Sequence, residues 1–309
     1  SLARARMEPR FGVKYKASER LRLKAAGGMY SQNVISANSD RDIVNLFYGF
    51  LAGPQNLQDD IQLPNGEERE IVHSLQTANH AVAGFEFDLT ERLNINTEGY
   101  IKHFTQLTNF NRNKLFPDNT TYADEPDAFK KDFIVERGRA VGADVVVKYE
   151  ERETYLWFVY GLGDVDRWDG FRWYDPVFDR RHNVNLVASQ GFGNGAWLVS
   201  ARWNLGSGLP FTQSQGYYQA PGTGGGIDGD YLTSNPGDIS IYLAGLNEGR
   251  LPAYHRLDLN VKRTWKEVGG GELELSAGVT NVYSRENIFY INRITCLLYT
   301  SDAADDSQC

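Results

Sequence analysis

The stretch that decides the fold is "RLPAYHRLDLNVKRTW", residues 250–265. From residue 256 to residue 261 it alternates polar Arg256, Asp258 and Asn260 with apolar Leu257, Leu259 and Val261. This alternation is typical of a β-strand whose two faces differ in chemistry. In a soluble sheet the apolar face covers a core, whereas in a membrane-spanning barrel it faces lipid. The rest of the chain has to distinguish these two cases.

Composition excludes several classes of protein. The 309 residues are 41% hydrophobic with a mean hydropathy of −0.47. The richest apolar run, "YLWFVYGLG" at 155–163, is far shorter than the roughly 18 residues of a spanning helix. A helical membrane protein is therefore excluded, while a barrel, whose strands expose only alternate residues to lipid, is not. The net charge of −8 argues against binding to nucleic acid, which needs a basic surface.

The two cysteines, Cys296 and Cys309, lie in the last fourteen residues. Disulfides and cysteine-based metal sites therefore cannot hold the body of this fold. The N-terminal "SLARARMEPRFGV" has no apolar segment of the kind that a signal peptide contains. We expect either a cytoplasmic chain or one whose true N-terminus is missing.

Alternating segments predict about ten strands, and the connections between them follow a rule. The predicted strands are 10–16, 20–30, 80–89, 93–104, 140–149, 154–165, 181–189, 196–206, 250–265 and 272–283. Short turns and long segments alternate strictly between them, which a soluble sandwich has no reason to do. A membrane-spanning barrel has short periplasmic turns and long extracellular loops, and its tilted strands are about ten residues long. We therefore predict an all-β, antiparallel transmembrane barrel in which Leu257, Leu259 and Val261 face lipid.

Aromatic residues near the ends of these strands fit the same prediction. Barrels place aromatic side chains at the two membrane surfaces. The predicted membrane-interface residues are Tyr30, Tyr149, Tyr254, Trp265 and Tyr283. If the long loops lie outside, the strand at 272–283 runs outward, and a closed barrel needs a further strand after it.

Several segments resemble those of TonB-dependent outer-membrane receptors, in the form found in Bacteroidota. The matching segments are "AGFEFDLTERLNINTEGYIKHFTQLTNFN" (83–111), "GRAVGADVVVKY" (138–149), "FDRRHNVNLVAS" (178–189), "SARWNLGSGLPFT" (200–212) and "ELELSAGVTNVYSRENIFYI" (272–291). The resemblance implies a 22-strand barrel around a plug. On that count this chain carries roughly strands 12 to 21, so it looks like a fragment without plug or TonB box.

The resemblance also divides the chain. Residues 1–295 are expected to form a partial receptor barrel. The tail "CLLYTSDAADDSQC" (296–309) breaks the strand pattern abruptly. Members of the family end on a strand with a terminal aromatic residue. We interpret the tail as a non-native read-through sequence.

No pattern in the sequence indicates catalysis. The chain contains no nucleophile elbow, phosphate-binding loop or zinc-binding helix. None of the five histidines has a partner at metal-ligand spacing. Asp228 and Asp230 are weak candidates for Ca²⁺ ligands, because carboxylates at this spacing can share an ion, although the full calcium-loop pattern is absent. We expect no enzyme activity and no cofactor.

The resemblance implies active uptake of a scarce nutrient such as a siderophore, a cobalamin, a glycan or a peptide. Its partners would be the TonB–ExbB–ExbD energy-coupling complex, acting through the plug, the lipid of the outer membrane of a Gram-negative bacterium, and a surface lipoprotein. Candidate ligand contacts in the long loops are Phe47, Tyr48, Phe50, Tyr217 and Tyr218.

Other readings remain open at this point. A passive porin would share every strand feature. A soluble or surface-attached all-β binding module would mix its loop lengths and stay in water. An outer-membrane enzyme would need a recognisable site at the barrel wall. Because half a barrel leaves unpaired strand edges and a lipid-facing surface, we expect the chain alone to aggregate or to need detergent.

Overall fold

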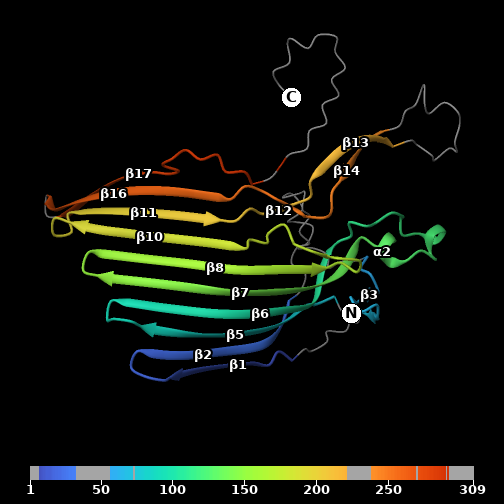
Figure 1. Ribbon diagram of the computed structural model, residues 1–309, viewed down its shortest axis with the longest axis horizontal. Helices are drawn as coiled ribbons and strands as arrows, with labels where there is room; N and C mark the ends of the chain where they lie inside the picture. The colour runs from blue at the N-terminus through green and yellow to red at the C-terminus, as the bar shows by residue number, and fades with distance from the viewer. Residues whose placement is uncertain are drawn as a thin grey trace, which may run out of the picture.

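The computed structural model describes residues 7–32, 56–71, 74–220, 238–268, 271–289 and 291. Ten long strands form one antiparallel sheet in which each strand pairs with the next long strand of the chain (Figure 1). These are β1 (Arg10–Lys16), β2 (Leu21–Gln32), β5 (Gln76–Asp88), β6 (Leu93–Phe110), β7 (Phe133–Glu151), β8 (Thr154–Trp168), β10 (His182–Phe192), β11 (Trp197–Gly206), β16 (Tyr254–Val268) and β17 (Gly271–Val279). The predicted set of about ten antiparallel strands is confirmed.

The connections between these strands lie at two different ends of the sheet. Short connections, from β1 to β2, β5 to β6, β7 to β8, β10 to β11 and β16 to β17, join strand ends at what we call the turn end. Long connections, from β2 to β5, β6 to β7, β8 to β10 and β11 to β16, join strand ends at the opposite loop end. The predicted alternation of short and long connections is therefore confirmed.

The register gives the sheet two chemically different faces. Between β11 and β16, one face carries the pairs Val199–Val261, Ala201–Leu259 and Trp203–Leu257. The other carries Ser200–Asn260, Arg202–Asp258 and Asn204–Arg256. Because side chains alternate along each strand, the same two faces continue across the sheet. We call them the apolar face and the polar face.

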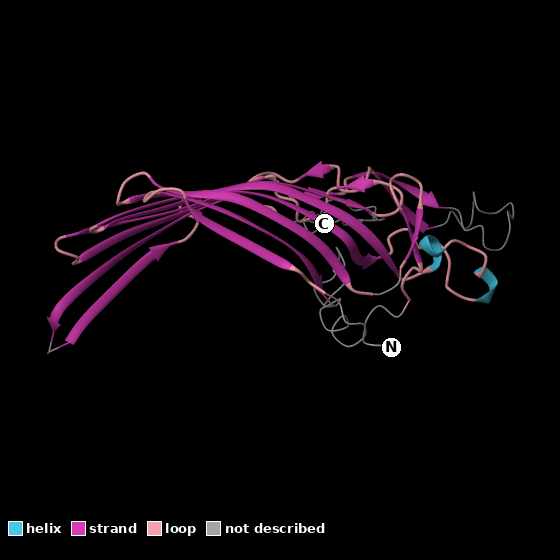
Figure 2. Ribbon diagram, turned by 90° about the horizontal axis from the view of Figure 1, so that it is seen from below, coloured by secondary structure: helices cyan, strands magenta, loops and turns pink. Residues whose placement is uncertain are grey.

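The sheet forms a single curved layer (Figure 2). Large apolar side chains on one face of its strands are exposed. Phe11 is 67% exposed, Leu275 64% and Ile101 54%. The buried hydrophobic residues among those described are few: Ile61, Ile134, Val135, Ala140, Tyr174 and Leu251. A soluble protein rarely exposes so large an apolar surface.

Short elements in the long connections were not predicted. They are β3 (Asp60–Gln62), β4 (Glu68–Glu70), η2 (Thr120–Tyr122), α2 (Asp127–Lys130), β9 (Trp173–Tyr174), β12 (Pro210–Phe211), β13 (Ser214–Ala220), β14 (Asp238–Leu243) and β15 (Gly249–Arg250). β3 pairs with β4, β12 with β15, β13 with β14, and β9 with the end of β8. In the described part of the chain, no helix is long and apolar enough to cross a bilayer.

Some strand ends differ from the prediction. β6 continues to Phe110 and β7 already begins at Phe133, because the two strands stay paired beyond the apolar stretch. β17 ends at Val279 rather than at residue 283. There Asn281 turns with a φ of 53°, and its backbone N–H donates to Asp258 Oδ1 at 2.9 Å.

Candidate ligand-binding surface

The β13–β14 hairpin extends from the loop end (Figure 1) and carries two of the predicted ligand contacts. Tyr217 pairs with Ile241 and Tyr218 with Ser240, and each tyrosine is 52% exposed. As neighbours in a strand, the two rings lie on opposite faces of the hairpin. The structure therefore does not bring them together, and their role in binding stays a prediction.

The register adds a third tyrosine that the sequence analysis missed. Tyr242 pairs with Gly216 and is 60% exposed. It lies on the same face of the hairpin as Tyr218, two register pairs further along. Alternation within 238–243 was a signal for this strand, but only the register shows which residues face each other.

The other loop predictions concern residues outside the described ranges. Phe47, Tyr48 and Phe50 lie there, and so do Asp228 and Asp230. Their roles as ligand contacts and calcium ligands stay predictions. Within the described ranges, no three His, Cys, Asp or Glu side chains form a group that could hold a metal ion.

A buried carboxylate organises the loop end on the polar face. Glu136 of β7 has no exposed surface. The Tyr174 hydroxyl lies 2.8 and 2.9 Å from its two oxygens, and Asn109 Nδ2 lies 3.2 Å from both. Arg112 Nη2 donates to Oε1 at 2.8 Å, and Arg167 Nη1 lies 3.4 Å from Oε2. We call these five residues the loop clamp.

Burial and charge keep the Tyr174 hydroxyl of the clamp protonated near neutral pH. Burial, and then the Glu136 carboxylate, raise the pKa of Tyr174 to about 12. The Tyr174 hydroxyl therefore keeps its proton and acts as a donor. The Arg112 guanidinium lies 4.5 Å above the centre of the Tyr174 ring, which adds a cation–π contact. A buried carboxylate with this many donors is satisfied and stabilising rather than reactive.

A second cluster connects two long loops. Asp179 is 1% exposed, and its Oδ2 lies 2.8 Å from Arg250 Nη2. Its Oδ1 accepts from the backbone N–H of Val165 at 3.2 Å. Arg250 also pairs with Asp175, whose carbonyl oxygen accepts from Asn247 Nδ2 at 2.8 Å. Loop 169–181 is thus held both to β8 and to loop 207–253.

These two clusters give the loop end a defined shape. Arg112 ties loop 111–132, and Tyr174 ties loop 169–181, to the wall at β7. Arg250 then ties loop 207–253 to loop 169–181. The β13–β14 hairpin extends from this connected part of the loop end (Figure 1).

The polar face between the two ends is lined with paired charges. Arg22 lies 2.9 Å from Glu86 and 2.7 Å from Asp88. Lys24 pairs with Glu98, and Lys262 lies 2.7 Å from Glu274. Such a surface stays wet and fits the predicted wall of an aqueous lumen.

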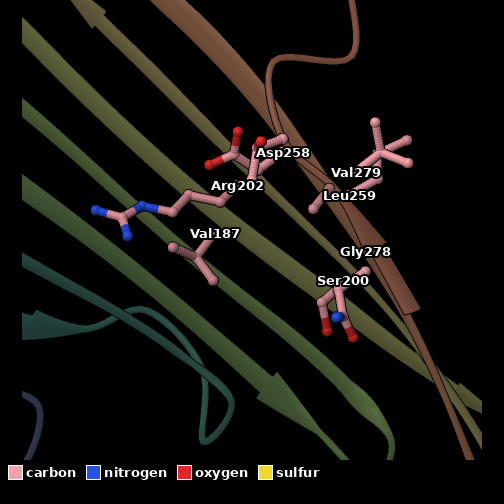
Figure 3. Close-up of a pocket in the computed structure, with 10 residues that line it drawn as sticks. Val187, Ser200, Arg202, Asp258, Leu259, Gly278 and Val279 are labelled. Atoms are coloured by element: carbon pink, nitrogen blue, oxygen red, sulfur yellow. The ribbon is translucent and has the colours of Figure 1, made fainter. Parts of the chain in front are cut away.

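A shallow hollow of about 290 Å³ lies where β10, β11, β16 and β17 meet (Figure 3). Asp258 at its rim accepts from Arg256 Nη2 at 2.8 Å as well as from the N–H of Asn281. Arg202, its neighbour across the strands, extends away from it (Figure 3). The hollow is open and holds no nucleophile paired with a base, so we assign no chemistry to it.

The predicted interface aromatics divide between the two faces. Trp265 pairs with Leu273, and Tyr149 with Leu93 and Leu156, on the apolar face near the turn end. Tyr30 instead stacks on His80 of the polar face, with ring centres 4.5 Å apart. Tyr254 pairs with Gly206 on the polar side of β16, as the alternation from Arg256 requires. Tyr283 follows β17.

Three further polar rings, Tyr160, His182 and His255, lie on the apolar face at the loop end and were not predicted. Tyr160 hydrogen bonds to His182 at 2.9 Å, and the predicted Tyr283 hydrogen bonds to His255 at 2.8 Å. These histidines continue the apolar rows of their strands. Amphipathic rings near the ends of membrane-spanning strands are typical of the membrane surface. The interface role of all these aromatics stays a prediction.

Comparison with known proteins identifies the fold. No protein-family model matches the sequence, and no curated protein matches it. Solved structures do match. One is the ferripyoverdine receptor of the outer membrane of Pseudomonas aeruginosa, with TM-score 0.53 and 12% identity over 91% of this chain and 29% of that one. A second is the ferric-catecholate import receptor Fiu of E. coli K12, with TM-score 0.51 and 13% identity over 92% of this chain and 31% of that one.

The ferric citrate transporter FecA is similar too, with TM-score 0.50 and 12% identity over 90% of this chain and 33% of that one. These matches are TonB-dependent outer-membrane receptors and transporters. The sheet therefore has the fold of part of their barrel wall. The chain spans about a third of the length of the structures it matches.

Proposed function

We propose that this chain is the C-terminal half of the barrel of a TonB-dependent outer-membrane transporter. The observation that supports this most strongly is the ten-strand wall, with one exposed apolar face, one charged face, and short and long connections at opposite ends. The likeness in fold to outer-membrane receptors supports the same assignment.

In this proposal the two faces of the sheet contact different solvents. The apolar face contacts lipid, so the exposure of residues such as Ile101 and Leu275 has a physical reason. The polar face lines the lumen, where the Arg22–Glu86 and Lys262–Glu274 pairs stay hydrated. The turn end faces the periplasm, and the loop end faces the outside of the cell.

The loop end is the proposed entry for the substrate. The loop clamp and the Asp179–Arg250 pair hold three long loops in place. Tyr217, Tyr218 and Tyr242 offer exposed aromatic rings to a ligand. Ferric chelates are the first class to test, because the proteins similar in fold are a ferripyoverdine receptor, a ferric-catecholate receptor and a ferric citrate transporter. Energy would come from TonB, ExbB and ExbD through a plug.

The experiment is an uptake assay in cells that carry the protein in the outer membrane. Radioactive iron is supplied as a catecholate chelate, a citrate chelate or a pyoverdine, with and without a protonophore. We expect saturable uptake of one chelate that stops when the protonophore is added. Uptake that is not saturable and ignores the protonophore would indicate a passive porin and contradict the proposal.

Variants of the hairpin test the entry site. Y218A and Y242A remove neighbouring rings from one face of the hairpin, and Q219A shortens an exposed side chain of the same strand without removing a ring. We expect the two tyrosine variants to raise the apparent KM for the chelate, while Q219A leaves it unchanged. Equal KM values for all three variants would show that this face of the hairpin does not contact the chelate.

A further inference from the structure

Three arginines and a histidine lie on the apolar face where it meets the loop end. The register pairs Ile101 with Val141 and, one step nearer the loop end on the same face, His103 with Arg139. Arg137 follows Arg139 on that face, and its Nη2 lies 3.3 Å from His103 Nε2. Arg69 of β4 donates from Nη2 to the carbonyl oxygen of Thr105 at 3.0 Å. We call the three arginines, Arg69, Arg137 and Arg139, the cationic patch.

Two of these arginines have no counterion among the described residues. Arg137 meets only the ring of His103, and its buried Nε has no hydrogen-bond partner there. Arg69 uses one nitrogen for the Thr105 carbonyl oxygen and forms no ion pair. Two neighbouring guanidinium charges without a carboxylate partner favour an anion that is supplied from outside the chain.

The carboxylates nearby are already used. Asp166 Oδ2 accepts from Nε and Nη2 of Arg139, both at 2.7 Å. Asp164 lies 2.5 Å from Arg181. In β4, Glu68 and Glu70 alternate with Arg69 and therefore point to the opposite side of the β3–β4 hairpin. Ile61, which pairs with Arg69, is fully buried, so the arginine side of the hairpin is the one that packs on the molecule.

Apolar surface begins directly beside the cationic patch. Ile101 is 54% exposed and Val141 47%, and Leu162 of the next strand is 40% exposed. The Trp173 ring, 45% exposed, lies on the patch itself, 5.4 Å from the Arg139 guanidinium. A molecule that fits this surface has an anionic head, for the arginines, and apolar chains that lie along the strands.

We propose that the cationic patch binds the phosphate headgroup of an anionic lipid of the outer leaflet, with its acyl chains on Ile101 and Val141. Arginine suits this role, because its planar fork of donors matches phosphate oxygens. Basic residues at a membrane surface attract anionic lipid headgroups in the same way. This inference rests on the proposed function, which places the apolar face in lipid and the loop end outside.

The test uses the protein that carries these strands, purified from membranes in detergent. Native mass spectrometry measures binding of lipid A, a glycolipid with two phosphates, and of the same glycolipid without phosphate. R69Q removes an exposed cation from the hairpin, and R69Q/R137Q removes both unpaired arginines. K102Q is the matched control, because Lys102 neighbours His103 in β6 but lies on the polar face, over the ring of Tyr100.

We expect lipid A to bind more tightly than its phosphate-free form. R69Q should weaken that binding roughly fivefold and the double variant roughly thirtyfold, since one arginine near a membrane surface contributes about a factor of five. K102Q should bind as the parent protein does. If the double variant does not fold, lipid binding by R69Q alone still tests the patch.

Three results would overturn the inference. Equal binding by the parent and R69Q/R137Q would show that the patch does not hold the phosphate. Inorganic phosphate that binds the patch as tightly as lipid A would indicate a site for the free ion. Both results leave the proposed transporter standing. A protein that stays monomeric in water without detergent would contradict the membrane assignment itself, and the lipid site with it.

Discussion

The middle of the sheet and its loop end are built in opposite ways. In the middle, large apolar side chains such as Leu275, 64% exposed, point out of a single layer, while the polar face carries the ion pairs. At the loop end a charged residue, Glu136, is fully buried and saturated with hydrogen bonds. On the proposed function, this difference means that two solvents surround the chain. Lipid would take the place of a core in the middle, and polar networks replace it where the strands enter water.

The largest effect should come from breaking the loop clamp. E136Q leaves Arg112 and Arg167 without their carboxylate, and we expect it to destabilise the loop end by about 3–5 kcal/mol. Hydrogen exchange should then rise in 111–132 and 169–181 but not in the middle of β6 and β7.

Y174F is the milder control, since it removes one donor and keeps both charges of the clamp. Unchanged exchange in both loops of E136Q would show that the clamp does not hold them.

A charge placed on the apolar face should have the next largest effect. L259R puts a cation where the proposal places lipid, at a cost of about 2–4 kcal/mol. N260R puts the same cation on the polar face of the same strand, where water is available. Urea unfolding from lipid vesicles measures both. Equal stability of the two variants would contradict the proposed difference between the apolar and the polar face.

A smaller effect tests the close packing on the polar face in the middle of the sheet. A Cβ on Gly142 would lie 2.5 Å from the Leu162 carbonyl oxygen and would also clash with the Tyr100 hydroxyl. We expect G142A to destabilise the wall by about 1–3 kcal/mol, because Tyr100 must move. Gly99 pairs with the neighbouring Ala143, and a Cβ there would have its nearest neighbour at 3.9 Å. G99A should therefore fold normally, and a G142A variant as stable as G99A would contradict this packing.

The smallest expected effect depends on pH and concerns the loop end alone. The pKa of Tyr174 is raised to about 12, against an ordinary value of 10.0. Its contribution to stability is complete below pH 10, because both folded and unfolded forms then keep the proton. It is lost as the pH rises from 10 to 12, since the unfolded form ionises first.

Hydrogen exchange at loop 169–181, corrected for the intrinsic rate at each pH, measures this loss. The protection of the loop should fall over this range in the parent protein and stay level in Y174F. A parallel fall in both would assign the change to other groups.

The fold could be predicted from the sequence because the alternation that indicates each strand lies within a few consecutive residues. Residues 256–261 alternate without a break, and the same pattern recurs at a spacing that the turns make visible. The ends of the strands were predicted less accurately. β6 and β7 continue past Ile101 and Val141 through residues such as Asn109 and Glu136, where polar and apolar residues no longer alternate regularly.

The polar clusters could not be predicted, because their members are far apart in the chain. Glu136 meets Tyr174 across 38 residues, and Asp175 meets Arg250 across 75. Nothing in the local sequence distinguishes these residues from other loop charges. Tyr242 was missed for a similar reason, since only the β13–β14 register places it beside Tyr218.

The central claim is that the apolar face contacts lipid and the polar face contacts water. Its most direct test is a series of single spin labels at positions 257 to 262 of β16, in the membrane-inserted protein. Relaxation by oxygen, which concentrates in lipid, is compared with relaxation by a water-soluble nickel complex. We predict a period of two, with Leu257, Leu259 and Val261 sensitive to oxygen, and Asp258, Asn260 and Lys262 sensitive to nickel. Equal sensitivity to nickel at all six positions would contradict the account.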